Sequence, residues 1–233
     1  MCGRFTLTVD AASLARMYSN DIGELAEWQP TFSIAPTERV PVVRERLDKD
    51  TGTVHREISP MEWGLRPSWA TTPGPKPINA RLETAATKRM FQQAFNRHRA
   101  IVPMSGYFEW VPEDGKKQPY YLFSEDHPIL HAAGLYAMRK DEHGEWQLTF
   151  AIITTDATDA AGRVHDRMPV LMPDELAADW VDPARLASGE EMTARLAAAA
   201  EASAKTLQVR KVSRRVNSVQ TADPHDASLL DPV

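Results

Sequence analysis

The sequence is short of the residues that build several common kinds of site. Cys2 is the one cysteine among 233 residues, which excludes an internal disulfide and any zinc or iron–sulfur site with several cysteine ligands. No run of about 18 apolar residues occurs, and Met1 precedes Cys-Gly-Arg instead of the apolar core of a signal peptide. We therefore expect a soluble, cytoplasmic protein without membrane contact, in which Cys2 is free to react.

A positive overall charge and internal repeats are also missing. The net charge of −5 gives no global basic field, so any binding to nucleic acid must come from a local cluster of Arg and Lys. With 42% hydrophobic residues the chain is still able to bury a sizeable core. The stretch Pro67–Pro77 is typical of a loop, because the flanking segments are too short for separate cores. The sequence predicts a single domain over residues 1–233.

Local patterns predict more strands than helices. Residues that favour strands recur at Arg4–Val9, Val40–Arg46, Val54–Ser59, Ala100–Pro103, Tyr107–Val111, Tyr120–Phe123, Gln147–Thr154 and Leu207–Val212. Turn signals that favour hairpins include Asp50–Gly52, Glu113–Gly115 and Glu142–Gly144. Helical patterns cover Ala11–Tyr18 behind Asp10 as N-cap, Ala85–Asn96, Pro173–Trp180 and Glu190–Lys205. Together they predict an α+β fold: a curved, mainly antiparallel sheet or open barrel with peripheral helices.

The position of Cys2 suggests a specific chemistry. Methionine aminopeptidases generally remove Met1 when the second side chain is small, which would make Cys2 the N-terminal residue of the mature protein. Its α-amine, with a pKa near 8, and its thiol then form a 1,2-aminothiol. The amine condenses with an aldehyde to a Schiff base, and the thiol adds to the imine carbon to close a thiazolidine ring. A frayed terminus is the common alternative, but Gly3 and the alternating Arg4–Thr8 predict a terminus anchored in a sheet.

One polar segment places three candidate side chains at alternating positions. In Pro77–Thr84, an extended backbone would project the amide of Asn79, the guanidinium of Arg81 and the carboxylate of Glu83 onto one face. Arg81 could then grip a phosphate, with Glu83 orienting it. A strand with a solvated polar face fits the same pattern.

Two titratable residues are candidates for acid–base chemistry. Aromatic residues flank Glu109, and burial among them would keep its carboxyl group protonated, although an outward-facing glutamate fits equally well. His165 stands between Arg163 and Arg167, whose charges disfavour the imidazolium form and could hold phosphate, while Asp166 partly offsets them. A lone histidine is more often structural than catalytic.

Several short motifs follow one another along the chain: Met1–Phe5, Ala35–Pro36, Trp63–Gly64, Asn79–Arg81 with Glu83–Thr84, Gly106–Trp110, His165–Pro169 and Val212–Ser213. Each is weak alone. As an ordered set over essentially the whole chain, they resemble the SRAP family (SOS response-associated peptidase, abasic-site processing protein). Ser33 and Ala70 depart from residues that are common in that family.

The resemblance implies a compact α+β domain that binds single-stranded DNA and shields abasic sites in the DNA damage response. Its N-terminal cysteine would form a thiazolidine crosslink with the ring-opened abasic aldehyde, with AP-lyase activity as a further outcome. Carried over by position, the catalytic residues are Cys2 as nucleophile, Asn79 positioning the terminus and sugar, Glu109 assisting proton transfer and His165 promoting ring opening. The DNA contacts would be Arg4, Arg81 and Arg167, with Trp69 stacking near the lesion, and we add Arg163 from its place beside His165. No metal or cofactor is implied, and we expect a monomer that associates with the nucleoid when it is bound to DNA.

Two other activities use the same residues. An N-terminal thiol peptidase or hydrolase would employ the α-amine as base for its own thiol, and self-removal of Met1 would be a limited form of that activity. A non-catalytic binder of modified DNA bases would need Arg81, Arg167 and Trp69 but gives Cys2 no task.

Overall fold

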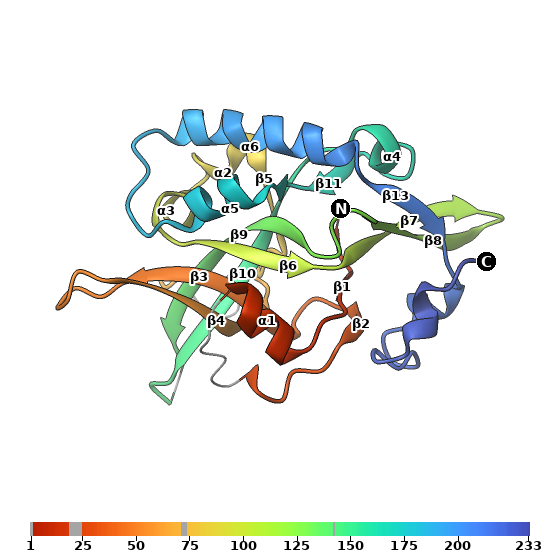
Figure 1. Ribbon diagram of the computed structural model, residues 1–233, viewed down its shortest axis with the longest axis horizontal. Coiled ribbons are helices and arrows are strands. Elements are labelled where there is room, and N and C mark those ends of the chain that lie inside the picture. Colours follow the sequence, from red (N-terminus) through yellow and green to blue (C-terminus); the bar gives the residue numbers. More distant parts are fainter. Residues whose placement is uncertain (1, 19–24, 71–73, 142) are drawn as a thin grey trace.

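Two sheets carry the strands of the molecule (Figure 1), of which the computed structural model describes residues 2–18, 25–70, 74–141 and 143–233. The first sheet has the order β13–β8–β7–β1–β2. Its strands are β1 (Phe5–Leu7), β2 (Thr31–Ile34), β7 (Gly106–Glu113), β8 (Lys116–Phe123) and β13 (Gln208–Lys211).

The second sheet has the order β11–β10–β4–β3–β6–β9–β12, and β5 pairs with β10 beside it. Pairing of β9 with β10 closes a ring through β4, β3 and β6, so the expected curved sheet is a closed barrel. Most pairs are antiparallel, while β10 runs parallel to β4 and β5. The strands are β3 (Arg39–Leu47), β4 (Val54–Trp63), β5 (Asn79–Arg81), β6 (Arg99–Met104), β9 (Leu130–Lys140), β10 (Trp146–Asp156), β11 (Arg167–Pro169) and β12 (Leu171–Met172).

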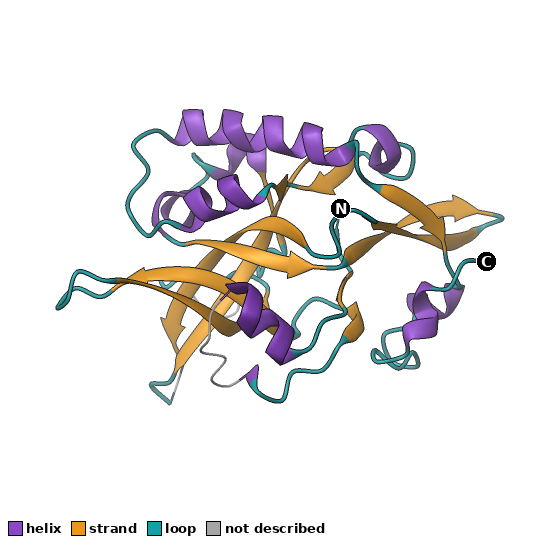
Figure 2. Ribbon diagram, in the orientation of Figure 1, coloured by secondary structure: helices purple, strands orange, loops and turns teal. Residues whose placement is uncertain are grey.

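The helices lie outside the strand framework, as Figure 2 shows. They are α1 (Ala11–Tyr18), α2 (Leu82–Ala85), α3 (Gln92–Arg97), α4 (Asp159–Gly162), α5 (Asp174–Val181), α6 (Gly189–Ala204) and the 3-10 helices η2 (Arg214–Asn217) and η3 (Ala227–Leu230). Helix α6 buries Met192, Leu196, Ala199 and Ala200, which share one face at helical spacing. Within the described ranges, no helix has the length and apolar character needed to cross a membrane. The α+β prediction with peripheral helices is confirmed.

Turn and cap signals placed several elements correctly. Gly52 and Gly115 adopt left-handed φ values of +71° and +70° in the β3–β4 and β7–β8 hairpins, where a glycine carries little steric cost. Asp10 accepts a hydrogen bond from the Ser13 N–H at 2.8 Å and so caps α1. The predicted turn after β9 includes Glu142, which lies outside the described residues.

The structure departs from the predicted elements in several places: strands β2, β9, β11 and β12 were not predicted, and one predicted helix is broken. Strand β9 was missed because its alanine-rich sequence holds a single strong strand former, Tyr136; its small residues are needed because a Cβ at Gly134 would lie 2.8 Å from Val102. The helix expected over Ala85–Asn96 is broken into α2 and α3. Residues 86–91 between the two helices form turns and a bend, in which the carbonyl oxygen of Thr84 accepts from the N–H groups of Thr87 and Lys88.

Candidate active site

Strand β10 brings distant segments of the chain together at its carboxyl end. On one side it pairs in parallel with β5, so that Ile152 lies opposite Asn79 and Thr154 opposite Arg81. On the other side it pairs with β11, which places Asp156 opposite Arg167. Residues separated by more than 80 positions therefore meet at one edge of the barrel.

The first sheet supplies Cys2 to this edge. Phe5 lies opposite Tyr107, and the Phe108 N–H donates to the carbonyl oxygen of Arg4 at 2.9 Å, so the terminal segment runs beside β7. Asn79 Nδ2 then donates to the carbonyl oxygen of Cys2 at 2.8 Å and joins the two sheets. The predicted anchoring of the terminus is thus observed, while Met1 lies outside the described residues.

The Cys2 side chain is fully buried, and burial raises the pKa of its thiol above the ordinary value. A buried thiol is a poor source of thiolate, which is the nucleophilic form. A buried thiol therefore fits best a reaction in two steps. An amine reacts first, and the Cys2 thiol reacts second, when it gives up its proton to a neighbouring base.

Glu109 lies close enough to Cys2 for its charge to act on the thiol. It lies on the same face of β7 as Tyr107, two residues away, and is 3% exposed. Burial raises the pKa of its carboxyl group to about 7, so it exchanges a proton near neutral pH. The Ser105–Trp110 segment reaches this position because Gly106 lies against Tyr121, where a Cβ would collide with the phenol ring.

His165 faces Glu109 across the site. Its Nε2 is 3.9 Å from Glu109 Oε2, too far for a direct hydrogen bond but close enough for one ligand atom to contact both. Burial lowers the pKa of the imidazole, and Asp166 partly offsets this, as the sequence predicted. Burial is the main cause, however, instead of the flanking arginines.

The proton of the neutral His165 ring belongs on Nε2. The Arg167 N–H donates to Nδ1 at 2.9 Å, which requires Nδ1 as acceptor. Asp166 Oδ1 lies 2.7 Å from the same nitrogen and favours the opposite tautomer, but its side chain is exposed and turns away readily, whereas the backbone N–H is fixed. The Nε2–H bond therefore points towards Glu109 and into the site.

Sequence reasoning named Tyr107 only as a neighbour of Glu109 and gave it no role. Its hydroxyl group is buried beside Cys2 and has no hydrogen-bond partner in the described part of the chain. Asn79 Oδ1 and Thr154 Oγ1 are buried without partners in the same way. Orphaned buried polar atoms are rare, and two of these three belong to Tyr107 and Asn79, which lie beside Cys2, so they mark a place for a polar ligand. No sequence signal distinguishes such a hydroxyl group from an ordinary core tyrosine.

Arg167 is held inside the site instead of projecting from it. It donates to both carboxylate oxygens of Glu83, at 2.8 and 3.0 Å, and to Asp156 at 2.6 Å. The prediction that Glu83 orients Arg81 from a shared strand was wrong, because β5 ends at Arg81 and Glu83 stands in the first turn of α2. Its carboxylate orients Arg167.

The other predicted DNA contacts differ in exposure. Arg4 is 7% exposed and donates to Ser33 Oγ and to the carbonyl oxygen of Val216, whereas Arg81 and Arg163 are exposed. Trp69 is 43% exposed and lies under the Arg89 guanidinium, in a hollow whose lining includes none of the four chemical residues. The structure thus joins Cys2, Asn79, Glu109 and His165 and leaves Trp69 apart from them.

Comparison with known proteins identifies the family. The sequence matches the family described as SOS response associated peptidase (SRAP) over residues 1–219, and the chain belongs to this family.

Named relatives extend over most or all of the chain. The abasic site processing protein YedK of Escherichia coli (strain K12) is 32% identical over 238 residues, covering 100% of both chains. The abasic site processing protein YoqW of Bacillus subtilis (strain 168) is also 32% identical, covering 78% of this chain and 81% of its own. A crystal structure of a protein from Bacteroides thetaiotaomicron has a TM-score of 0.79 at 23% identity over the whole of both chains, which supports the fold alone.

Proposed function

We propose that this protein processes abasic sites in single-stranded DNA by forming a covalent link through Cys2 once Met1 has been removed. The observation that carries the proposal is the cluster of Cys2, Asn79, Glu109 and His165 at one edge of the barrel, with orphaned buried polar atoms around it. The names of the relatives, abasic site processing proteins, support the substrate class.

The reaction balances with the side chains at hand. The α-amine of Cys2 attacks the aldehyde carbon of the ring-opened abasic sugar, and the resulting carbinolamine loses water to give an imine. The Cys2 thiol then adds to the imine carbon, forming the carbon–sulfur bond while its proton passes to the nitrogen. In this proposal Glu109 and His165 carry protons in these steps, while Asn79 holds the backbone of Cys2. Strand cleavage by β-elimination from the imine would be the lyase outcome.

The proposal is tested with purified protein and three oligonucleotides on a denaturing gel. One carries an abasic aldehyde, one carries a tetrahydrofuran analogue that lacks the aldehyde, and one is undamaged. We expect a heat-stable band of protein joined to DNA only for the oligonucleotide that carries the aldehyde. The yield of this band should be higher with single-stranded than with duplex DNA. Equal labelling of the tetrahydrofuran strand, or no band at all, contradicts the proposal.

A peptidase activity is a second candidate, supported by the description of the family. Its simplest form is removal of Met1 by the Cys2–Glu109 pair. Protein synthesised without methionine aminopeptidase should then lose Met1 in the wild type and keep it in Glu109→Gln. Retention of Met1 by both would remove this activity.

A further inference from the structure

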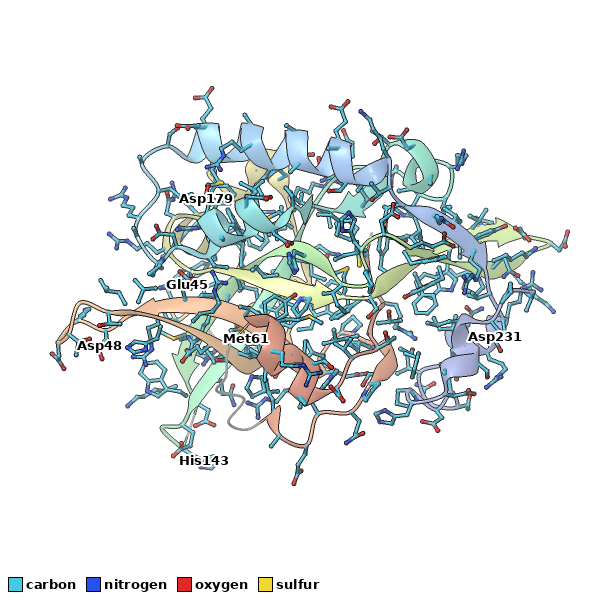
Figure 3. The ribbon with its side chains drawn as sticks, viewed as in Figure 1. Glu45, Asp48, Met61, His143, Asp179 and Asp231 are labelled. Carbon is cyan, nitrogen blue, oxygen red and sulfur yellow. The ribbon has the colours of Figure 1, made fainter. Side chains whose placement is uncertain are left out.

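Two β-hairpins project from the barrel on the side away from β7 and β8 (Figure 1). Figure 3 marks Asp48 at the tip of the β3–β4 hairpin and His143 near the tip of the β9–β10 hairpin. A hollow of about 520 Å³ lies between them. Its lining includes Arg39, Arg44 and Arg46 from one hairpin and Met138 and Trp146 from the other.

This hollow continues along the surface. A second hollow of about 400 Å³ shares Met138 and Trp146 with it and adds Arg139 and Lys140. The second hollow in turn shares Ser68, His98 and Met138 with the one that holds Trp69. We name this continuous track, from Trp69 past Trp146 to Arg46, the hairpin groove.

An indole ring stands exposed at the middle of the hairpin groove. Trp146 is 65% exposed, although large aromatic side chains usually lie buried. It pairs across the hairpin with Lys140, whose ammonium group lies 5.3 Å from the ring centroid. Met138 and Leu148 form the neighbouring pair on the same face and supply an apolar floor. Such a platform accepts a flat ring by stacking.

The charge of the lining side chains indicates which kind of partner fits the hairpin groove. Five basic side chains line the two hollows between the hairpins: Arg39, Arg44, Arg46, Arg139 and Lys140. The same lining includes one carboxylate, that of Glu57. Glu57 pairs with Arg44 at 2.5 Å, which leaves a net excess of positive charge. The chain as a whole carries −5, so this local excess runs against its overall balance. A polyanion with stackable rings fits both features, whereas a peptide would need to supply several carboxylates and an aromatic side chain together.

We propose that the hairpin groove binds the single-stranded DNA that flanks the abasic site, with a base stacked on Trp146 and phosphates near Arg46, Arg139 and Lys140. This inference rests on the proposed function, which supplies single-stranded DNA as the ligand. It adds a second point of attachment, so that a long strand is held more tightly than a short one.

The test measures binding as a function of flank length. Fluorescence anisotropy with undamaged single-stranded oligonucleotides needs no reaction at Cys2, so its outcome stands whether or not a crosslink forms. Adduct yield with abasic oligonucleotides extended on the 5′ or the 3′ side then shows which flank enters the groove. The variants are Trp146→Ala, Trp146→Phe and Arg46→Ala. The matched control is Arg56→Ala, on the opposite face of the β3–β4 hairpin, where Arg56 pairs with Glu45.

We expect Trp146→Ala to weaken binding of long oligonucleotides about tenfold, because one base loses its stacking partner. Trp146→Phe should restore most of the affinity, and Arg46→Ala should lower the salt slope by about 0.7. The shortest oligonucleotides and the Arg56→Ala control should bind as before. The inference is overturned if Trp146→Ala binds oligonucleotides of every length with wild-type affinity while its thermal unfolding is unchanged. It is also overturned if the affinity of the wild type does not depend on oligonucleotide length. Binding of an acidic aromatic peptide in preference to DNA would overturn it as well.

Discussion

Asn79 donates its side-chain amide to the backbone carbonyl oxygen of Cys2 across 2.8 Å, from strand β5 of one sheet to the segment before β1 of the other. This hydrogen bond fixes where the α-amine of Cys2 lies once Met1 is gone. The same amide leaves its oxygen Oδ1 buried without a partner among the described residues, as an acceptor for a ligand. Asn79 is therefore expected to position the nucleophile instead of reacting itself.

Replacing Asn79 by Ala should slow adduct formation by about 10- to 100-fold, because a small displacement of the amine misaligns its attack on the aldehyde. Binding of undamaged single-stranded DNA should be unchanged. Single-turnover crosslinking kinetics and fluorescence anisotropy separate the two quantities. Equal losses of rate and affinity would show that Asn79 acts through binding.

The raised pKa of Glu109 predicts a dependence of stability on pH. Burial raises its pKa from 4.5 to about 7, so the folded protein retains a proton that the unfolded chain releases. The resulting stability is present below pH 4.5 and is lost as the pH rises through 7. Glu109→Gln stays neutral, so it should match the wild type near pH ~4 and exceed it by about 3 kcal/mol near pH ~9.

Urea unfolding of both proteins across this range measures the difference in free energy. Glu201→Gln makes the same change at an exposed position on α6 and serves as the control. A difference between Glu109→Gln and the wild type that stays constant with pH would show that the carboxyl group of Glu109 titrates as in the unfolded chain.

His165→Ala should slow adduct formation without preventing it, by about 10²- to 10⁴-fold, because the imidazole only assists proton transfer. Release of DNA from a preformed adduct should slow as well, since a catalyst lowers the barrier in both directions. A time course of formation, and of exchange onto a competing abasic oligonucleotide, measures both rates. Wild-type rates in both directions would make His165 structural.

Arg81 is an exposed arginine on β5, two residues after Asn79, so it is expected to contact a phosphate directly. Arg81→Ala should weaken binding of single-stranded DNA and lower the slope of log affinity against log salt by about 0.7. Arg16→Ala, which removes an exposed charge from α1, is the control. An unchanged slope for Arg81→Ala removes this residue from the path of the DNA.

Local sequence patterns predicted the elements whose signals are local. Alternation and glycine turns located the β3–β4 and β7–β8 hairpins, and Asp10 located the start of α1. Strand β9 was not predicted because packing inside the closed barrel, where Gly134 lies against Val102, requires its small residues. Such packing depends on residues far away in the sequence, which local patterns do not show.

The same division holds for the site. Cys2, Glu109 and His165 could be predicted because their chemical settings are recognisable along the chain. These settings are a terminal aminothiol, a carboxyl group among aromatic residues and an imidazole flanked by arginines. Which arginine Glu83 orients depends on where β5 ends, and no local signal in the sequence marks that end. Arg81 was therefore expected as the partner of Glu83, whereas the structure has Arg167. The buried hydroxyl group of Tyr107 became visible only when β1 was seen beside β7.

The central claim, a thiazolidine at Cys2, is tested most directly by the intact mass of the adduct for wild type and Cys2→Ser. Imine and thiazolidine have the same mass, that of protein plus oligonucleotide minus one water, but only the imine reverses on heating or is trapped by borohydride. The wild type should keep this mass after heating without reductant, whereas Cys2→Ser should keep an adduct only after reduction. A heat-stable, unreduced adduct of the serine variant would contradict the account.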